Sequence, residues 1–360
     1  MTQTTEELEN NSMSLPNNTP KRILIVKLSA IGDVLMATPA AKVLRTAFPD
    51  SYIAWVVERK SAEVITGNPY LDEVIIWDRV KTSGHWDNPI RNLTGFVKLK
   101  SKLREKHFDV CLDMQGLMRS ALVSLASGAS RRIGFTDAGE KAHLFYTERY
   151  NPGTDLLVAQ QRNLDLLKPL GVESTDMDMH MPIMDADRAF ATQFFNDNNI
   201  ANNKVIGFLP ATTWVNKHWT VENWSALADV VATKYGATPL IFGSKADIKM
   251  AQNISNGASN KPVIAAGQTT LKQAGALMER CEVVVGVDTG LLHMSVALNR
   301  PSIGLFGASV WRCFLKRDNF IWISKDFECS PCLRHPTCEN VDCMRAITPA
   351  DIDQAIEKLI

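Results

Sequence analysis

The order of apolar runs along this chain constrains its fold more than any other feature. In the first half, short runs rich in β-branched residues recur at 22–27, 52–57, 73–77 and 108–114. The segments 33–48 and 93–108 between them carry apolar residues every three or four positions, which is typical of amphipathic helices. Strands and helices therefore alternate, and this predicts an α/β fold with a doubly wound parallel sheet.

The same rhythm starts again in the second half. Five further runs, KVIGFLP, TPLIFG, KPVIAA, EVVVGV and SIGLF, predict a second sheet of the same kind without any visible sequence repeat. A chain of 360 residues that is 45% hydrophobic is long enough for two separate cores. We expect an N-terminal Rossmann-like domain over 21–184 and a C-terminal one over 185–360, with the boundary near Met184. The polar residues 1–20 are expected to form a disordered tail.

The formal net charge is zero, with 39 basic and 39 acidic residues. This balance argues against a nucleic-acid partner, and any anionic ligand must be met by local donors. The start of the chain lacks the basic and apolar parts of a secretion signal, and no run of about 18 apolar residues follows. We therefore expect a soluble, cytoplasmic protein.

Seven cysteines are present. Cys111, Cys281 and Cys313 lie in apolar surroundings, which indicates buried thiols in a reducing compartment. The other four form a C-x2-C-x5-C-x4-C pattern and offer potential zinc ligands, although the second half of this spacing is uncommon for zinc. A metal site and a reduced or crosslinked loop both remain open for Cys329, Cys332, Cys338 and Cys343.

Ligands of open parallel sheets bind beyond the carboxyl ends of the strands, so residues just after a strand are the informative ones. The first strand runs into a turn at Ser29 and Gly32, and Asp33 follows at the start of a helix. Asp33 either caps this helix or projects into a cleft as a general base. The GxGxxG spacing of a dinucleotide fingerprint is missing here, which lowers the case for a nicotinamide enzyme.

The run of valines in the second half ends at Asp288, Thr289 and Gly290 before an apolar helix. Gly290 allows close approach to the backbone, and the helix N-terminus offers N–H groups to an anion such as a pyrophosphate. His293 in the first turn is either a structural histidine or a donor to that anion.

A third junction, GFLPATTWVNKHW, places Thr212 and Thr213 after a strand and Lys217 shortly beyond them. Lys217 either is a solvated lysine between packed tryptophans or carries positive charge to a leaving diphosphate. At a fourth junction, Asp247 is a helix cap or an acceptor for a ribose or base edge. Residues 79–106 hold eight basic residues against two acids, which indicates a solvated helix face or a patch for anionic head groups.

Together these junctions resemble the ADP-heptose lipopolysaccharide heptosyltransferases, which have the GT-B architecture of two facing Rossmann-like domains. ILIVKLSAIGDVLMATPA, DMQGLMRSALV, ATTWVNKHW and VGVDTGLLHMSVALNRP stand in the family's order, and the resemblance runs from Arg22 to the C-terminal helix.

The resemblance implies inverting transfer of a heptose from ADP-heptose to a hydroxyl of the lipopolysaccharide inner core, without a cofactor or a metal. Asp33 matches the proposed base and Lys217 matches a lysine at the donor phosphates. A well-known member carries glutamate where this chain has the shorter Asp247. The matched donor-binding positions are Thr212, Thr213, Lys217, Asp247, Asp288, Thr289, Gly290, Leu291 and His293, and the expected acceptor-binding positions are Ser29, Arg119 and Arg131.

A lipid acceptor also implies peripheral contact with the cytoplasmic face of the inner membrane. Two alternatives remain open at this stage. One is a related glycosyltransferase that uses another nucleotide sugar, and the other is a nucleotide-binding module without catalysis, in which Asp33 only caps its helix.

Overall fold

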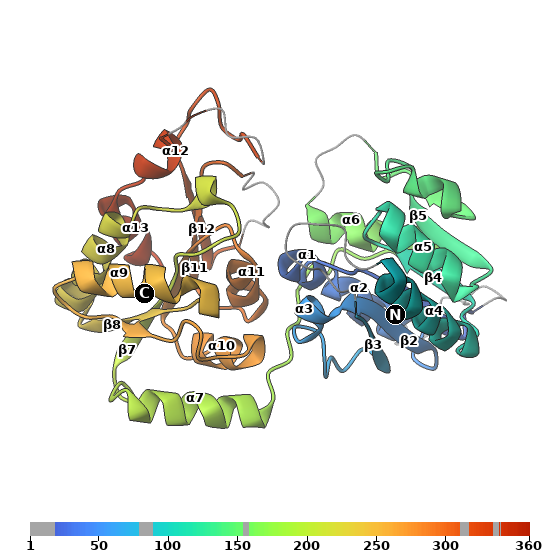
Figure 1. Cartoon of the computed structure of the whole chain (residues 1–360), viewed down its shortest axis with the longest axis horizontal. Coiled ribbons are helices and arrows are strands. Elements are labelled where there is room, and N and C mark those ends of the chain that lie inside the picture. Colours follow the sequence, from blue (N-terminus) through green and yellow to red (C-terminus); the bar gives the residue numbers. More distant parts are fainter. Residues whose placement is uncertain (1–18, 79–88, 154–157, 310–316, 334–337, 339) are drawn as a thin grey trace, which may run out of the picture.

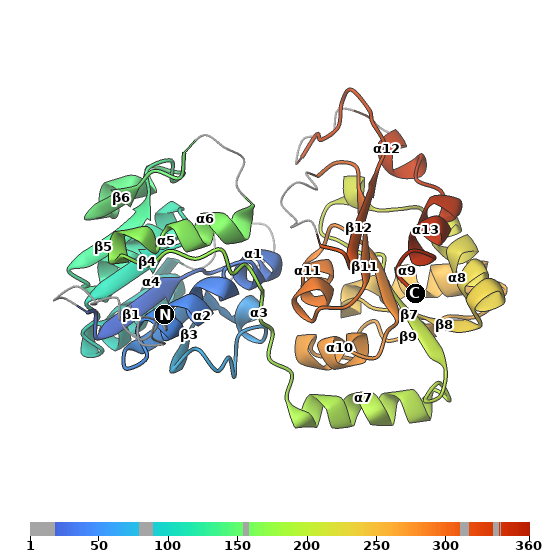
Figure 2. The ribbon, with the colours of Figure 1, turned by 180° about the vertical axis from the view of Figure 1, so that it is seen from behind.

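The computed structural model describes residues 19–78, 89–153, 158–309, 317–333, 338 and 340–360. It has two lobes, each built on one six-stranded parallel sheet with helices packed against it (Figure 1 and Figure 2). The predicted disordered tail lies almost wholly outside the described residues, and so does Cys313.

The N-terminal sheet has the strand order β3-β2-β1-β4-β5-β6. In the central strand β1, Ile23 lies between Ile53 of β2 and Val110 of β4. The strands are β1 (Arg22–Val26), β2 (Tyr52–Glu58), β3 (Glu73–Trp77), β4 (Val110–Asp113), β5 (Arg131–Phe135) and β6 (Glu148–Tyr150). The helices are α1 (Ile31–Leu35), α2 (Thr38–Ala47), α3 (Arg59–Ala62), α4 (Pro89–Glu105), α5 (Met118–Ser127), η1 (Ala142–Phe145), α6 (Ala159–Asp165) and η2 (Lys168–Leu170).

The C-terminal sheet has the order β12-β11-β10-β7-β8-β9, which is the same topology when its strands are counted from β7. The strands are β7 (Lys204–Leu209), β8 (Ala237–Ile241), β9 (Val263–Ile264), β10 (Val283–Val287), β11 (Ser302–Phe306) and β12 (Phe320–Ser324). The helices are α7 (Asp185–Asp197), η3 (Val215–Lys217), α8 (Val221–Tyr235), η4 (Lys245–Asp247), α9 (Ile248–Gly257), α10 (Leu271–Met278), α11 (Gly290–Ala297), α12 (Asp342–Arg345) and α13 (Pro349–Ile356).

The helix expected directly after the first strand is two helices. α1 ends at Leu35, and α2 starts at Thr38 with Pro39 in its first turn. Proline is well suited to this position, because its missing N–H has no partner at a helix start. The break leaves α1 as a short separate helix at the carboxyl edge of the sheet.

The two tryptophans of residues 217–224 belong to the core. Trp219 and Trp224 are almost fully buried, and their rings meet edge to face with centroids 5.0 Å apart. The Trp219 indole N–H donates to Ile347 O at 2.9 Å, which satisfies its polar atom. Lys217 lies in the segment between β7 and these buried rings, which fix the backbone on its C-terminal side.

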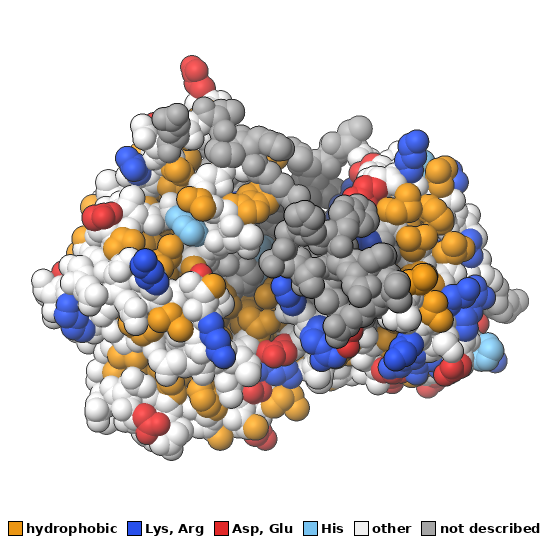
Figure 3. All heavy atoms as spheres, viewed as in Figure 1, with side chains coloured by type: hydrophobic (Ala, Val, Ile, Leu, Met, Phe, Trp, Pro, Cys, Tyr) orange, Lys and Arg blue, Asp and Glu red, His pale blue; other side chains and the backbone are white. Residues whose placement is uncertain are grey.

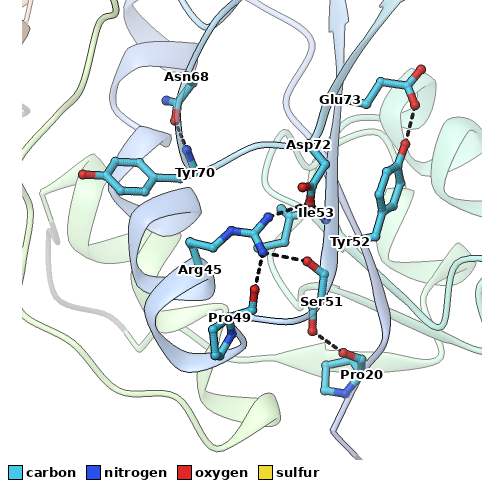
Figure 4. A network of polar contacts seen from close by, with 10 residues as sticks. All are labelled: Pro20, Arg45, Pro49, Ser51, Tyr52, Ile53, Asn68, Tyr70, Asp72 and Glu73. Carbon is cyan, nitrogen blue, oxygen red and sulfur yellow. Dashed lines mark hydrogen bonds and ion pairs between the residues drawn. The ribbon is translucent and has the colours of Figure 1, made fainter.

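A polar network ties the opposite, amino end of the N-terminal sheet together (Figure 4). Arg45 in the last turn of α2 donates to Pro49 O and Ser51 O, both at 2.8 Å, and to Asp72 Oδ2 at 2.6 Å. Asp72 Oδ2 also accepts from Ile53 N at 2.7 Å. This network therefore lies at the end of the sheet opposite to Asp33, which follows the carboxyl end of β1.

The lobes are joined through α7, which starts directly after Met184 and runs beside the C-terminal lobe in both views (Figure 1 and Figure 2). They also touch directly, because Lys272 Nζ donates to Thr66 O at 2.6 Å and Leu271 N donates to Glu63 Oε2 at 2.8 Å. In the described part of the chain, no helix has the length and apolar character needed to cross a membrane.

Candidate active site

The two sheets present their functional residues at equivalent places. In each sheet the strand order reverses between two central strands, β1 and β4 in one and β7 and β10 in the other. The loops after these strands diverge and leave a crevice, where ligands of such sheets bind. Asp33 follows β1, while Thr212, Lys217 and Asp288 follow β7 and β10.

In the C-terminal lobe, Lys217 and Asp288 form an ion pair. Lys217 Nζ lies 2.5 Å from Asp288 Oδ2 and 4.3 Å from the ring centroid of Trp214. The side chains of Lys217 and Asp288 are only 13% and 18% exposed. Thr212 Oγ1 donates to Asp288 O at 2.9 Å, which joins the two strand ends. The lysine ammonium is therefore fixed beside the start of α11, where backbone N–H groups also offer positive partial charge.

The first turn of α11 continues this cluster. Thr289 is the N-cap residue, Gly290 and Leu291 follow half-buried, and His293 is 8% exposed. His293 Nε2 lies 4.0 Å from Asp288 Oδ1. Burial lowers the pKa of His293, and the nearby carboxylates of Asp288 and Asp33 offset only part of this effect. The imidazole is thus kept neutral at pH 7 between two acidic groups.

Contact between α1 and α11 brings the two lobes together at this point (Figure 1). A Cβ atom on Gly32 would lie 2.4 Å from Cδ2 of His293, and one on Gly290 would lie 3.0 Å from Cβ of Ile31. Only hydrogen fits at Gly32, so the backbone next to Asp33 rests directly on the His293 ring.

Asp33 fulfils the capping role that its position predicts. Its Oδ2 accepts from Ala30 N at 3.0 Å at the start of α1. A carboxylate has two oxygens and about four lone pairs, so this bond leaves acceptor capacity for a ligand hydroxyl. Capping and proton acceptance are compatible at this residue.

Asp33 also lines a cavity of about 250 Å³ in the N-terminal lobe. Lys27 lies there at the end of β1 and donates from Nζ to Met114 O at 2.8 Å. Burial lowers the pKa of Lys27, and the carboxylates of Asp33 and Asp113 oppose that shift. Arg162 reaches the cavity from α6 and pairs with Asp137 at 2.6 Å. The cavity therefore combines one candidate base with two cations.

Lys27 and Arg162 were not predicted from the sequence, and neither were Gln115, which lines this cavity, and its partner Asp113. Gln115 Oε1 accepts from Leu28 N at 3.1 Å and from Ser29 N at 3.2 Å. Asp113, which is fully buried, accepts from Gln115 N and from the Tyr146 hydroxyl. Burial raises the pKa of Asp113. The segment DMQGLMRS held the signal, because its acid ends a buried strand and its amide comes two residues later.

None of the three expected acceptor residues is among the residues that line this cavity. Arg119 donates to Ser29 Oγ at 2.8 Å and to Glu58 at 3.2 Å, so these side chains lie together beside the loop after β1. Arg131 starts β5, at the other end of the sheet, and is bound to Glu148 and Pro169 O. Arg131 and Asp33 thus lie at opposite ends of the sheet. A strand of the length of β5 spans roughly 15 Å, so the two side chains are not brought together.

Two other predicted donor residues lie on the edge of the C-terminal site. Thr213 is exposed one residue after Thr212. Asp247 Oδ2 accepts from Ser244 N at 2.7 Å and Ser244 Oγ at 2.6 Å, which is the capping role considered for it. Thr213 follows β7 and Asp247 follows β8, and these two strands are neighbours in the sheet.

Comparison with known proteins places this geometry in a family. Residues 96–341 match glycosyltransferase family 9 (heptosyltransferase). The chain belongs to this family. Lipopolysaccharide heptosyltransferase 1 of Salmonella typhimurium is 29% identical over 291 residues, which are 79% of this chain and 88% of that protein.

Solved structures agree with the assignment. The glycosyl transferase family 9 protein of Veillonella parvula matches with a TM-score of 0.80 at 23% identity, over 94% of this chain and 97% of that one. The E. coli heptosyltransferase WaaC with ADP-2-deoxy-2-fluoro heptose matches with a TM-score of 0.70 at 26% identity, over 94% and 99%. The predicted GT-B fold and the prediction that the chain is a glycosyltransferase are confirmed.

Proposed function

We propose that this family 9 enzyme transfers a heptose from ADP-L-glycero-D-manno-heptose to a hydroxyl of the lipopolysaccharide inner core, with inversion at the anomeric carbon. One observation carries the proposal. Asp33 on the N-terminal lobe and the Lys217, Asp288 and His293 cluster on the C-terminal lobe meet where Gly32 contacts His293.

The donor is assigned to the C-terminal lobe. Lys217 and the N-terminal N–H groups of α11 supply positive charge for a diphosphate. Asp288 holds Lys217 in place before the donor binds. A solved neighbour that aligns over most of this chain contains an ADP-heptose analogue, which supports the same donor class here.

The acceptor is assigned to the N-terminal cavity. The acceptor oxygen attacks the anomeric carbon from the face opposite the diphosphate, and its proton passes to Asp33. The bond between the anomeric carbon and the phosphate oxygen breaks, and its electron pair leaves with ADP. Lys217 stabilises the negative charge that develops on this leaving group. Lys27 and Arg162 are placed to bind an anionic acceptor.

An exposed surface of apolar and basic side chains on the N-terminal lobe would suit an enzyme with a lipid acceptor. Leu93 and Val97 on α4 are 63% and 55% exposed beside the exposed Lys98 and Lys100, and exposed leucines lie on the adjacent α5. Figure 3 shows basic and hydrophobic side chains gathered on this face. By contrast, Lys102 and Lys106 pair with Glu73 and belong to the fold. We propose peripheral binding of this face to the anionic inner membrane.

The test of function is a donor panel with a heptose-deficient lipopolysaccharide acceptor. We expect acceptor-dependent release of ADP from ADP-heptose. NMR of the product should show an anomeric configuration opposite to that of the donor. Consumption of another nucleotide sugar in place of ADP-heptose would support the alternative glycosyltransferase. Donor binding without any transfer would support the non-catalytic alternative.

Membrane contact is tested separately by sedimentation with anionic vesicles at low and high salt. We expect binding that weakens with salt and falls on Val97→Asp, with Val215→Asp as the control, since Val215 is 76% exposed on the other lobe. Equal binding by both variants would contradict the assigned face.

A further inference from the structure

The structure gives no support to a metal site at the four cysteines near the C-terminus. Cys329, Cys332, Cys338 and Cys343 are free thiols, and among the residues that the structure describes no three potential ligands are grouped so that they could hold a metal ion.

The loop after β1 is held by a side chain from the end of the neighbouring strand β4 (Figure 2). At the ends of these strands, Met114 N donates to Val26 O at 3.0 Å, as one backbone group to another. Beyond that point the acceptor is a side chain, because Gln115 Oε1 accepts from Leu28 N at 3.1 Å and from Ser29 N at 3.2 Å. Two consecutive backbone N–H groups thus donate to one amide oxygen.

This loop leads directly to the carboxylate of Asp33. Ala30 follows Ser29, and its N–H donates to Asp33 Oδ2 at 3.0 Å. Val34 N donates to Ala30 O at 2.9 Å, which starts the first turn of α1. The direction of the Ala30 N–H group therefore decides where the Asp33 carboxylate lies, and a shift of residues 28–29 is passed on to it.

The position of Gln115 is fixed by a buried carboxylate. Asp113 ends β4 and is fully buried, and its Oδ1 accepts from Gln115 N at 3.0 Å and from Gly116 N at 3.1 Å. Gly116 has a φ angle of +68°, a left-handed conformation that glycine adopts without steric cost. The turn after β4 is thus folded around Asp113, and the Gln115 side chain leaves it at a fixed point.

The other oxygen of Asp113 is bound by a buried tyrosine. The hydroxyl of Tyr146 donates to Asp113 Oδ2 at 2.9 Å, and Tyr146 is 5% exposed. Gly134 lies opposite Asp113 in β5 and leaves room for the ring, because a Cβ atom there would lie 2.2 Å from Tyr146 Cε2. A buried polar network whose members are hydrogen-bonded is rigid, so Gln115 rests on a fixed support.

We propose that Gln115 is a positioning residue for Asp33, and that the pair of Asp113 and Tyr146 holds Gln115 in place. This inference rests on the proposed function, in which Asp33 accepts the proton of the acceptor hydroxyl. A general base must lie within hydrogen-bond reach of that hydroxyl, and a misplacement of about 1 Å costs about a hundredfold in rate. Gln115 also lines the cavity assigned to the acceptor, so the test must separate positioning from direct binding.

Loss of the Gln115 oxygen should loosen this loop without unfolding the lobe. On the side of β2, Glu58 N donates to Leu28 O at 3.0 Å, and Arg119 donates to Ser29 Oγ at 2.8 Å. These bonds remain in Gln115→Met. Methionine also has a similar length and fills the same space, but it has no amide oxygen.

The first measurement is amide hydrogen exchange by NMR on the full-length protein. We expect slow exchange at Leu28 and Ser29 in the wild type, and exchange at least about tenfold faster in Gln115→Met. Gln193→Met is the control, because Gln193 is exposed on α7, and it should leave both amides unchanged. Fast exchange of these amides in the wild type would overturn the proposal without any variant, and so would equal exchange in Gln115→Met.

Steady-state transfer from ADP-heptose then separates positioning from acceptor binding. Gln115→Met should lower kcat by at least about tenfold, and it should leave the KM for the acceptor and the affinity for ADP within about threefold of wild type. A higher KM for the acceptor with unchanged kcat would assign Gln115 to acceptor binding and overturn the proposal.

The deciding comparison adds the substitution to Asp33→Asn. In this background Gln115→Met should cost less than about threefold in single-turnover rate, because the carboxylate that it positions is already gone. An equal loss in both backgrounds would show a general structural effect and overturn the proposal. Tyr146→Phe removes only the hydroxyl and should lower the rate by about threefold in the wild-type background alone. An unchanged rate would refute the part assigned to Asp113 and Tyr146.

Failure of this inference is distinguishable from failure of the proposed function. Wild-type protein that transfers no heptose from ADP-heptose would count against the proposed function. Hydrogen exchange needs neither donor nor acceptor, so it still shows whether Gln115 holds residues 28–29. Normal wild-type transfer with unchanged kcat in Gln115→Met would refute the positioning role and leave the proposed function standing.

Discussion

Replacing Gly32 by alanine tests whether the contact between the lobes is part of the working enzyme. Gly32 lies within α1, where alanine has the higher helix propensity, so local structure favours the change. The added Cβ would nevertheless lie 2.4 Å from Cδ2 and 2.9 Å from Cγ and Nε2 of His293. Carbon atoms in contact are separated by about 3.5 to 4.0 Å, so one helix must move by roughly 1 Å.

His293 has little room to turn away, because it is buried in the first turn of α11. The displacement therefore passes to Asp33 on one side or to the donor cluster on the other. A misplacement of about 1 Å costs about a hundredfold in rate, which is about 2.7 kcal/mol of activation free energy. We expect this loss in kcat for Gly32→Ala, with little change in the unfolding of either lobe, since the lobes can separate slightly.

The assay is acceptor-dependent ADP release, accompanied by a thermal unfolding curve. Gly95→Ala is the matched control, because Gly95 lies in α4 and a Cβ there would be 3.4 Å from Asp78 O, which is an ordinary contact. If Gly32→Ala keeps its kcat within about threefold of wild type, the contact between α1 and α11 is not maintained during turnover, and the reasoning fails.

Three further predictions follow from the charges. Lys217→Ala should reduce turnover of ADP-heptose by about a hundredfold or more through loss of charge at the leaving diphosphate, and full turnover would contradict its role. Hydrogen bonds from Lys102, Lys106 and Tyr52 outweigh burial and lower the pKa of Glu73 to about 2. Solvent screens these partly exposed pairs, so Glu73→Gln should cost only about 1 kcal/mol of unfolding free energy at pH 7. The difference in unfolding free energy between wild type and Glu73→Gln should shrink as pH falls from about 4.5 to 2. Denaturant unfolding at several pH values measures it, and a difference that stays constant with pH would contradict a role for these ion pairs. Burial lowers the pKa of His293, so the folded state should lose stability as pH falls below about 6.5, and NMR titration giving an ordinary or raised pKa would refute this.

Much of the fold was predictable because buried parallel strands are apolar along their whole length. The runs at β3 and β11 have the predicted bounds, and the second half repeats the topology of the first. β5 was missed because it starts with Arg131 and Arg132, and β6 because three residues give no periodicity. β12 was not predicted either, although its sequence FIWIS is apolar and β-branched enough to indicate a strand.

The candidate site was only partly predictable. The rule that ligands bind after strands identified Lys217 and Asp288, which the structure joins in an ion pair. It could not identify Arg162, which reaches the cavity from a helix 129 residues further along the chain than Asp33. Lys27 lies at the end of its strand and reads as an ordinary solvated lysine until tertiary structure buries it.

The central claim is that Asp33 accepts the proton of the acceptor hydroxyl. Asp33→Asn keeps an oxygen that can accept from Ala30 N, so the cap of α1 is preserved. Asp50→Asn is the control, because Asp50 is an exposed carboxylate on the same lobe.

The direct measurement is single-turnover transfer from ADP-heptose to the truncated lipopolysaccharide acceptor by wild type, Asp33→Asn and Asp50→Asn. We predict a rate at least about a hundredfold lower in Asp33→Asn alone, with unchanged ADP affinity because the donor residues lie on the other lobe. Transfer by Asp33→Asn at the wild-type rate would contradict the account.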